Sequence, residues 1–192
     1  MAEPATSPRE GRLESPRERL RLLIRTRSLL TEGRFTLASG AESSVFFDMK
    51  RTMLHPEGAN LIADAVLDRL AGRTVDAIGG LVMGAVPIVA VACARSAARS
   101  HPVEGFFVRK EAKNHGTATL IDGNFSAGAR VVILEDVTTT GGSALRAVDA
   151  VTAAGGSVIV VLTIVDRLEG AAEAFRARGL PFEAIFTRDD FL

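Results

Sequence analysis

The sequence predicts an α/β protein built on an open, mostly parallel β-sheet with helices on both faces. Strand-like apolar runs alternate with amphipathic helical patterns along the chain, and two of these runs, 131–136 and 157–166, show almost no polar alternation. Such runs are typical of strands buried on both faces, and alternation of strands with helices implies parallel connections. The 192 residues are enough for one domain of this class.

The N-terminal part is expected to contain a tail, a helix and a small hood. Residues 1–16 are rich in Pro, Ser, Glu and Arg, which predicts a disordered tail followed by a single domain over 17–192. A helical pattern begins at Pro16 and continues through Leu30, with Gly33 marking its end. A Ser/Gly turn then separates four apolar residues, Phe35, Leu37, Phe46 and Phe47. This pattern predicts a small β-hairpin, or hood, outside the main core.

The body of the chain is expected to alternate helices and strands. Apolar residues at a spacing near 3.6 and closing glycines indicate the helices, and short apolar runs indicate the strands. In chain order these are a helix over 58–71, a strand over 75–80, a helix over 87–98, strands over 103–110 and 131–136, a helix over 144–154, a strand over 157–166 and a helix over 169–178. Ligands bind beyond the carboxyl ends of such strands, which selects segments 79–84, 109–116, 135–143 and 166–167.

Composition narrows the class of protein. The 23 basic and 23 acidic residues give no net charge, so we expect no nucleic-acid partner and no attraction to a membrane surface. A single cysteine, Cys93, excludes an intramolecular disulfide framework. No apolar run approaches the roughly 18 residues of a spanning helix, and the first residues lack the apolar centre of a secretory signal. A cytoplasmic enzyme is the expectation.

The most informative segment is VVILEDVTTTGGSA, at 131–144. An apolar strand delivers two carboxylates to its tip, and hydroxyl and glycine residues then lead into a helix. Amides at a helix N-terminus and nearby hydroxyls suit a phosphate, whereas paired carboxylates suit sugar hydroxyls or Mg²⁺ held through water. Solvated acids and a Thr-capped helix are common separately, so only their ordered combination is specific. The candidate ligand contacts are Glu135, Asp136, Val137, Thr138, Thr139, Thr140, Gly141, Gly142 and Ser143.

A basic segment follows residues 103–108 of the expected strand. Four basic side chains lie within seven residues: Arg109, Lys110, Lys113 and His115. Charge of this density faces water or a polyanion, because unpaired burial is too costly. A solvated surface loop is one interpretation. The other is a closing loop that clamps an anionic leaving group such as diphosphate and excludes water.

Two motifs together identify a resemblance to a known family. The segment at 131–144 resembles the phosphoribosyl-diphosphate motif of type I phosphoribosyltransferases. The segment FFVRKEAKNHGT, with its R-K-x-x-K-x-H-G pattern, resembles the catalytic loop of orotate phosphoribosyltransferases in particular. The resemblance implies that Glu135 and Asp136 contact the ribose hydroxyls and that the loop after them holds the 5′-phosphate. It implies that the four basic residues contact diphosphate, with Lys113 stabilising the departing charge and His115 either donating a proton or only contacting the ligand.

Further matches extend the resemblance over roughly 17–192. The segment FTLASG with Phe46, Phe47 and Asp48 resembles the family's hood, Arg167 resembles the strand-end arginine that pairs with the orotate carboxylate, and Thr139 aligns with a threonine that contacts the base. The resemblance implies transfer of the phosphoribosyl group from 5-phosphoribosyl 1-diphosphate to orotate, with Mg²⁺ held mainly by substrate and water. It also implies a homodimer in which the 109–116 loop is shared across subunits.

Two positions depart from the family's better-known form. Ala38 stands where that form has a lysine before Ser-Gly, and Val82 and Met83 stand where it has a tyrosine–lysine pair. Lys50 or Arg51 are the candidates to replace the missing charge. Three alternatives stay open: a phosphoribosyltransferase for another base such as a purine, a non-catalytic regulator that senses the diphosphate, and a subunit active only beside a partner enzyme. Residues without an expected chemical role are His55, His101 and Cys93, expected to be structural or exposed, and Met49, Met53 and Met83, expected to pack.

Overall fold

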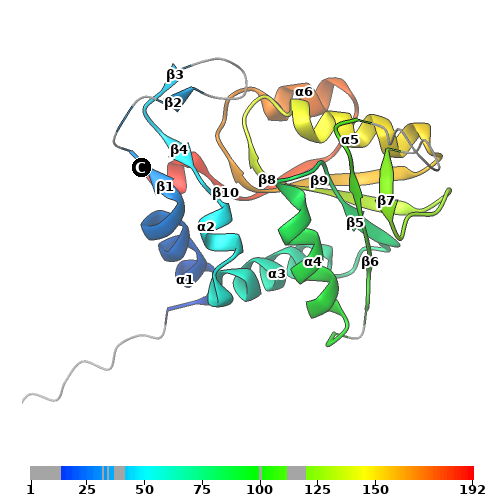
Figure 1. Ribbon diagram of the computed structural model, residues 1–192, viewed down its shortest axis with the longest axis horizontal. Helices are drawn as coiled ribbons and strands as arrows, with labels where there is room; N and C mark the ends of the chain where they lie inside the picture. The colour runs from blue at the N-terminus through cyan, green and yellow to red at the C-terminus, as the bar shows by residue number, and fades with distance from the viewer. Residues whose placement is uncertain (1–13, 32, 34, 37–41, 100, 112–119) are drawn as a thin grey trace, which may run out of the picture.

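The computed structural model describes residues 14–31, 33, 35–36, 42–99, 101–111 and 120–192. Within these ranges the centre of the molecule is a six-stranded sheet in the order β10-β9-β8-β5-β6-β7 (Figure 1). All neighbouring strands run parallel except the edge pair β6 and β7. The strands span β5 Ala77–Gly79, β6 Glu104–Val108, β7 Ile121–Gly123, β8 Arg130–Thr138, β9 Ser157–Asp166 and β10 Phe182–Thr187. The expected open, mostly parallel sheet is confirmed.

Helices cover both faces of this sheet, as expected (Figure 1). One face carries α1 (Pro16–Leu23), α3 (Pro56–Leu70) and α4 (Ala85–Ser96), and the other carries α5 (Gly142–Ala153) and α6 (Ala171–Ala177). The side chains of β8 show why both faces of the sheet are apolar. Val132 and Leu134 pack into the core on the α3–α4 side, while Val131 and Ile133 pack toward α5. Successive side chains of a strand point to opposite faces, so a strand covered on both sides must be apolar throughout.

The expected strands of the central sheet and the helices that cover it correspond closely to the structure, but two strands of the described sheet were not expected. The helices over 58–71, 87–98, 144–154 and 169–178 are α3 to α6, and the four expected strands are β5, β6, β8 and β9. Strand β8 continues to Thr138, so this threonine belongs to the strand rather than to the loop after it. Strands β7 and β10 were not expected. Both lie at sheet edges, where short pairings leave a weak signal in the sequence.

The first helix ends earlier than the sequence pattern predicts. Helix α1 begins at Pro16, and the side chain of Ser15 caps it by accepting a hydrogen bond from the Glu18 amide at 3.2 Å. The helix therefore starts at the expected residue, which is also the last residue of the predicted tail; residues 1–13 of that tail lie outside the described part. A π-helical turn (Ile24–Ser28) follows, and the chain then becomes strand β1 (Leu29–Leu30) instead of remaining helical to Gly33. The prediction was wrong because pairing with a distant strand overrides the local helical pattern.

The hood is present but is divided between two pairings. Strands β2 (Phe35–Thr36) and β3 (Glu42–Ser43) form an antiparallel hairpin, whereas β4 (Phe46–Phe47) pairs with β1. Leu37 lies outside the described residues. Phe35 and Phe46 stack with their ring centroids 5.5 Å apart.

The expectation that the hood lies outside the main core is wrong at Phe47. Its side chain is 4% exposed, belongs to the core and packs against Phe191. The β1–β4 pairing turns this alternate side chain inward. After β4, helix α2 (Lys50–Met53) follows, and Met49 and Met53 are buried in the core as expected.

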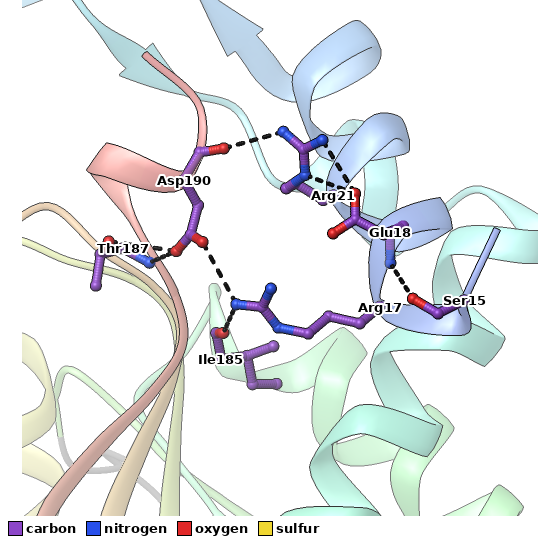
Figure 2. Close-up of polar contacts among 7 residues, drawn as sticks. All are labelled: Ser15, Arg17, Glu18, Arg21, Ile185, Thr187 and Asp190. Atoms are coloured by element: carbon purple, nitrogen blue, oxygen red, sulfur yellow. Dashed lines mark hydrogen bonds and ion pairs between the residues drawn. The ribbon is translucent and has the colours of Figure 1, made fainter.

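Polar contacts join the first helix to the C-terminal segment (Figure 2). Arg17 donates to the Ile185 carbonyl at 3.2 Å, and Arg21 donates to the Asp190 carbonyl at 3.2 Å. The Asp190 carboxylate caps the 3₁₀ turn η2 (Arg188–Asp190) by accepting from the Thr187 amide at 2.7 Å. These contacts hold α1 against the edge strand β10. Over the described ranges no helix is long and apolar enough to cross a membrane.

Candidate active site

The candidate site lies where the strand order reverses. Strand β6 lies on one side of β5, and the later strand β8 lies on its other side. The chain therefore builds the sheet outward in opposite directions from the boundary between β5 and β8. In open α/β sheets this point, beyond the carboxyl ends of the strands, is where ligands bind. A cavity of about 370 Å³ opens there, between the end of β8 and the start of α5.

The cavity brings together most of the residues expected from the 131–144 motif. Its lining includes Lys110, Glu135, Val137, Thr138, Thr139, Thr140, Gly141, Gly142 and Ser143. Three further lining residues, Leu81, Ala144 and Arg146, were not expected. Arg146 donates to the Lys110 carbonyl at 3.0 Å and so ties the basic segment to helix α5. Its position, one turn into the helix after Ser143, is the signal that could have indicated it.

The turn into α5 has the form of an anion site. Gly141 adopts a left-handed conformation with φ 84°, and among the described residues no side chain caps the helix that begins at Gly142. The first amides of the helix therefore remain available, and the helix dipole favours negative charge in front of them. A Cβ atom at Gly141 would also lie 2.9 Å from the Phe175 ring. Glycine is thus required at this turn both by the backbone angle and by the packing.

Glu135 is a buried carboxyl group inside the cavity. Its side chain is 6% exposed, and within the described part of the chain Oε2 has no hydrogen-bond partner. Burial raises the pKa of Glu135 well above its ordinary value of 4.5, and the negative charge of the adjacent Asp136 raises it further. A buried acceptor without a partner carries an energetic cost, which a ligand hydroxyl would remove.

Asp136 approaches the same place from the other face of β8. It does not line the cavity, and its Oδ1 accepts a hydrogen bond from the Val137 amide at 2.8 Å. Both carboxylates nevertheless converge on Gly84, where a Cβ atom would lie 2.6 Å from Asp136 Oδ1 and 3.1 Å from Glu135 Oε1. The 79–84 turn therefore packs directly on the acidic pair, which leaves no room for a side chain at Gly84.

Arg167 lies at the end of the neighbouring strand rather than in the β8 cavity. Its side chain is 3% exposed, and Nη2 donates to Ser43 Oγ at 2.8 Å and pairs with Glu169 Oε1 at 2.9 Å. Its backbone amide donates to the Thr138 carbonyl at 2.9 Å. The arginine therefore connects the end of β8 to the hood strand β3.

The basic segment is only partly described. Lys110 lines the cavity, whereas Arg109 forms an ion pair with Asp122 of β7 and lies over the Phe107 ring. The structure thus directs Arg109 toward the sheet edge. Lys113 and His115 lie outside the described residues, so their expected roles stay predictions.

The positions that depart from the family pattern differ in their surroundings. Ala38 lies outside the described residues. Met83 is 68% exposed, so the expectation that it packs is wrong, because the turn between β5 and α4 projects beyond the core. Lys50 pairs with Asp48 at 3.1 Å, and Arg51 donates to the Arg27 carbonyl at 3.4 Å, so both candidate replacements are engaged near α2.

Residues expected to be structural or exposed are found in such places. His55 caps α3, since its Nδ1 accepts from the Gly58 amide at 3.3 Å. His101 is exposed and Cys93 is half-buried. Burial raises the pKa of the Cys93 thiol, which disfavours the reactive thiolate.

Comparison with known proteins gives a consistent result. Residues 51–175 match the phosphoribosyl transferase domain family. Orotate phosphoribosyltransferase of Rhodopseudomonas palustris (strain TIE-1) is 49% identical over 180 residues, which cover 92% of this chain and 96% of that protein. The crystal structure of Mycobacterium tuberculosis H37Rv orotate phosphoribosyltransferase in complex with Fe(III) dicitrate superposes with a TM-score of 0.81 at 40% identity, over 92% of this chain and 99% of that one. The same enzyme in complex with 5-phospho-alpha-D-ribosyl 1-diphosphate gives a TM-score of 0.77 at 36% identity, over 92% and 99% of the two chains.

Proposed function

Because the chain belongs to the orotate phosphoribosyltransferases, within the phosphoribosyltransferase family, we propose that the β8–α5 cavity binds 5-phosphoribosyl 1-diphosphate for transfer to orotate. The enzyme forms orotidine 5′-phosphate and diphosphate, a step of pyrimidine biosynthesis. The observation that carries the placement is the buried Glu135, whose unpartnered oxygen shares one cavity with the open N-terminus of α5. The cavity thus combines an acceptor for sugar hydroxyls with donors for a phosphate.

The binding roles follow from the chemistry of each group. The amides after Gly141, with the hydroxyls of Thr139, Thr140 and Ser143, are donors that suit the 5′-phosphate. Glu135 and Asp136 suit the ribose hydroxyls, because a carboxylate accepts two hydrogen bonds from neighbouring hydroxyls. Lys110 adds a positive charge at the rim for the diphosphate. Val137 and Leu81 line the cavity with apolar surface between these groups.

Catalysis requires positioning and charge stabilisation more than covalent participation. Substitution at the anomeric carbon passes through a transition state like an oxocarbenium ion, as in glycoside hydrolysis. The acidic pair at the end of β8 favours positive charge on the ribosyl ring, and the rigid strand end holds that ring in line with the base. Lys113 stabilises the departing diphosphate, and His115 contacts it or supplies a proton.

The acidic pair also suits Mg²⁺. Its donor set consists of hard carboxylate oxygens, one of which, Glu135 Oε2, has no partner among the described residues. Within the described ranges no cluster of three or more metal-ligating side chains occurs. Glu135 and Asp136 would hold the ion through water or sugar hydroxyls. When bound, it neutralises charge on the diphosphate.

We propose a homodimer in which the 109–116 loop is shared across subunits: Lys110 lines the cavity of its own chain, and later residues of the loop reach the cavity of the other. This proposal is supported by the exposure of Lys110 and Glu111 at the start of the loop and by the position of Lys110 in the cavity lining. A cytoplasmic location stays a prediction from the sequence.

The decisive experiment is a direct assay of the purified protein. We expect loss of orotate absorbance when 5-phosphoribosyl 1-diphosphate and Mg²⁺ are added, and no turnover with hypoxanthine or adenine, since the buried Arg167 suits a carboxylated base. Omitting Mg²⁺ tests the metal separately. Turnover of a purine instead of orotate would contradict the base assignment. Binding of the diphosphate substrate without turnover of any base would indicate a sensor.

A further inference from the structure

Arg167 is an unusual charge because it is almost completely buried and incompletely hydrogen-bonded. Its side chain is 3% exposed, and its Nη2 is shared by Ser43 Oγ at 2.8 Å and Glu169 Oε1 at 2.9 Å. Within the described part of the chain, no acceptor faces Nε. In a guanidinium group, Nε and one terminal nitrogen form a fork that matches the two oxygens of a carboxylate. One donor of this buried arginine therefore lacks a partner among the described residues, while Nη2 already serves Glu169.

The turn after β9 holds Glu169 in place. Leu168 adopts a left-handed conformation with φ 59°, which is uncommon for a residue with a large side chain. Its amide donates to Asp166 Oδ1 at 2.9 Å, and the Asp166 side chain is itself buried. The Leu168 side chain is 46% exposed, so packing does not explain this backbone. This conformation at Leu168 reverses the direction of the chain, so that the Glu169 carboxylate contacts Arg167. Strained backbone conformations of this kind are concentrated at functional sites.

The two partners of the ion pair differ in their access to water. Glu169 is 30% exposed and can turn outward into solvent, whereas Arg167, at 3% exposure, cannot. A buried arginine without a counter-charge would be strongly unfavourable, so Glu169 supplies that charge in the free protein. A ligand carboxylate that offers two oxygens to the Nε and Nη2 fork could replace Glu169 without leaving the arginine unpaired.

We propose that Glu169 is a specificity-determining residue of the base site, which neutralises Arg167 until the carboxylate of orotate takes its place. Ser43 is a positioning residue that keeps Nη2 fixed during this exchange. A base without a carboxylate leaves the Arg167–Glu169 pair intact and gains nothing from the arginine. The inference rests on the proposed function and names residues that the sequence motifs did not indicate.

Substitution of Glu169 gives the main test. In Glu169→Gln the side chain that competes with orotate for Arg167 loses its charge. The KM for orotate should therefore fall by about three- to tenfold at saturating 5-phosphoribosyl 1-diphosphate. The inhibition constant of uracil, which has the same ring without the carboxylate, should not change. Glu173→Gln, at an exposed position on α6, is the matched control and should change neither constant.

Additional variants separate competition from general disturbance. Glu169→Asp keeps the charge but shortens the side chain and so weakens the pair with Arg167. It should also lower the KM for orotate, and it replaces Glu169→Gln in the test if that variant folds poorly. Ser43→Ala should raise the KM for orotate while Ser43→Thr preserves it, and the exposed Ser44→Ala should have no effect. The increase in melting temperature produced by orotate alone gives a second readout, which should be larger for Glu169→Gln than for the wild type.

The outcomes distinguish this inference from the assignment of function. A wild-type protein that does not consume orotate would contradict the proposed function itself. If the wild type is active, an orotate KM that rises or stays constant in both Glu169 variants would overturn only the role of Glu169. Equal changes for orotate and uracil would also overturn it, because they would show a general effect on the base site.

Discussion

Glu135 combines three properties that conflict with stability and favour function. It is buried, it has an oxygen without a partner in the described part of the chain, and it is adjacent to a second carboxyl group. Each property disfavours the charged form, and together they raise the pKa of Glu135 well above 4.5. Perturbed groups of this kind are concentrated in active sites, where a ligand provides the missing interaction.

Replacing this carboxyl group should therefore stabilise the free protein. When the folded-state pKa is raised, the folded protein binds a proton that the unfolded chain releases, so stability falls as pH rises above the ordinary value of 4.5. Glu135→Gln should remove this loss and increase the free energy of unfolding by about 0.5–2 kcal/mol at neutral pH, with lower turnover. Urea unfolding across the pH range measures the difference. An advantage that persists unchanged below pH 4.5 would contradict the explanation, and Asp149→Asn, at an exposed site on α5, is the control.

Lys113 offers a complementary test of charge stabilisation in the transition state. Lys113→Ala should lower kcat by about 10²- to 10³-fold, while the KM for 5-phosphoribosyl 1-diphosphate changes much less, because the leaving-group charge develops only during reaction. Steady-state kinetics with orotate provides both constants. Glu111→Ala, in the same loop, is the control. An unchanged kcat in the lysine variant would remove Lys113 from the mechanism.

At the scale of elements, the contact between α1 and the C-terminal turn shows how distant segments stabilise one another. The Asp190 carboxylate accepts from the Thr187 amide at 2.7 Å and from Arg17 at 3.4 Å, so one side chain both caps η2 and holds α1 (Figure 2). The neighbouring Asp189 is 68% exposed and pairs only with the adjacent Arg188 in the described part of the chain. The two acids therefore provide a matched comparison.

Asp190→Ala should lower the free energy of unfolding by about 1–2 kcal/mol, which is the usual cost of a lost cap. Asp189→Ala should lower it by less than about 0.5 kcal/mol, because exposed surface substitutions have small effects. Chemical denaturation of the two variants measures both values. Equal losses would show that the α1 contact contributes nothing measurable.

At the scale of the whole molecule, the proposed dimer makes a prediction about which subunit supplies each part of the basic loop. Lys110 lines the cavity of its own chain, where Arg146 binds its carbonyl at 3.0 Å. The proposed dimer places the following residues of the loop in the partner's cavity. One site would then take Lys110 from its own chain and Lys113 from the other.

A subunit-mixing experiment tests this arrangement. Lys113→Ala and Asp136→Asn should each be inactive alone, and their mixture should recover up to about a quarter of wild-type activity if each mixed dimer has one intact site. Activity is measured after the two variants exchange subunits under mild denaturation and refolding. The control is each variant taken alone through the same denaturation and refolding. No recovery in mixed dimers would show that the loop acts within its own subunit.

The amino-acid sequence by itself determined the parts of this protein that depend on contiguous residues. The apolar runs of β8 and β9 predicted a buried parallel sheet, and the segment at 131–144 predicted the acidic strand end and the glycine turn, of which Glu135 and the turn lie in one cavity. Arg167 was also indicated, although only through the family resemblance. These features are local, so their physical causes can be recognised along the chain.

Only the tertiary structure decided which distant residues complete them. The pairing of β1 with β4 ended the first helix early and buried Phe47, and no local pattern marked either result. Arg167 meets Ser43, which is 124 positions away, and the sequence gives no indication of this contact. Side chains that are far apart in the sequence become neighbours only when the sheet and the hood pack together. Their partners depend on which side chains that packing buries against one another, and local sequence does not encode this.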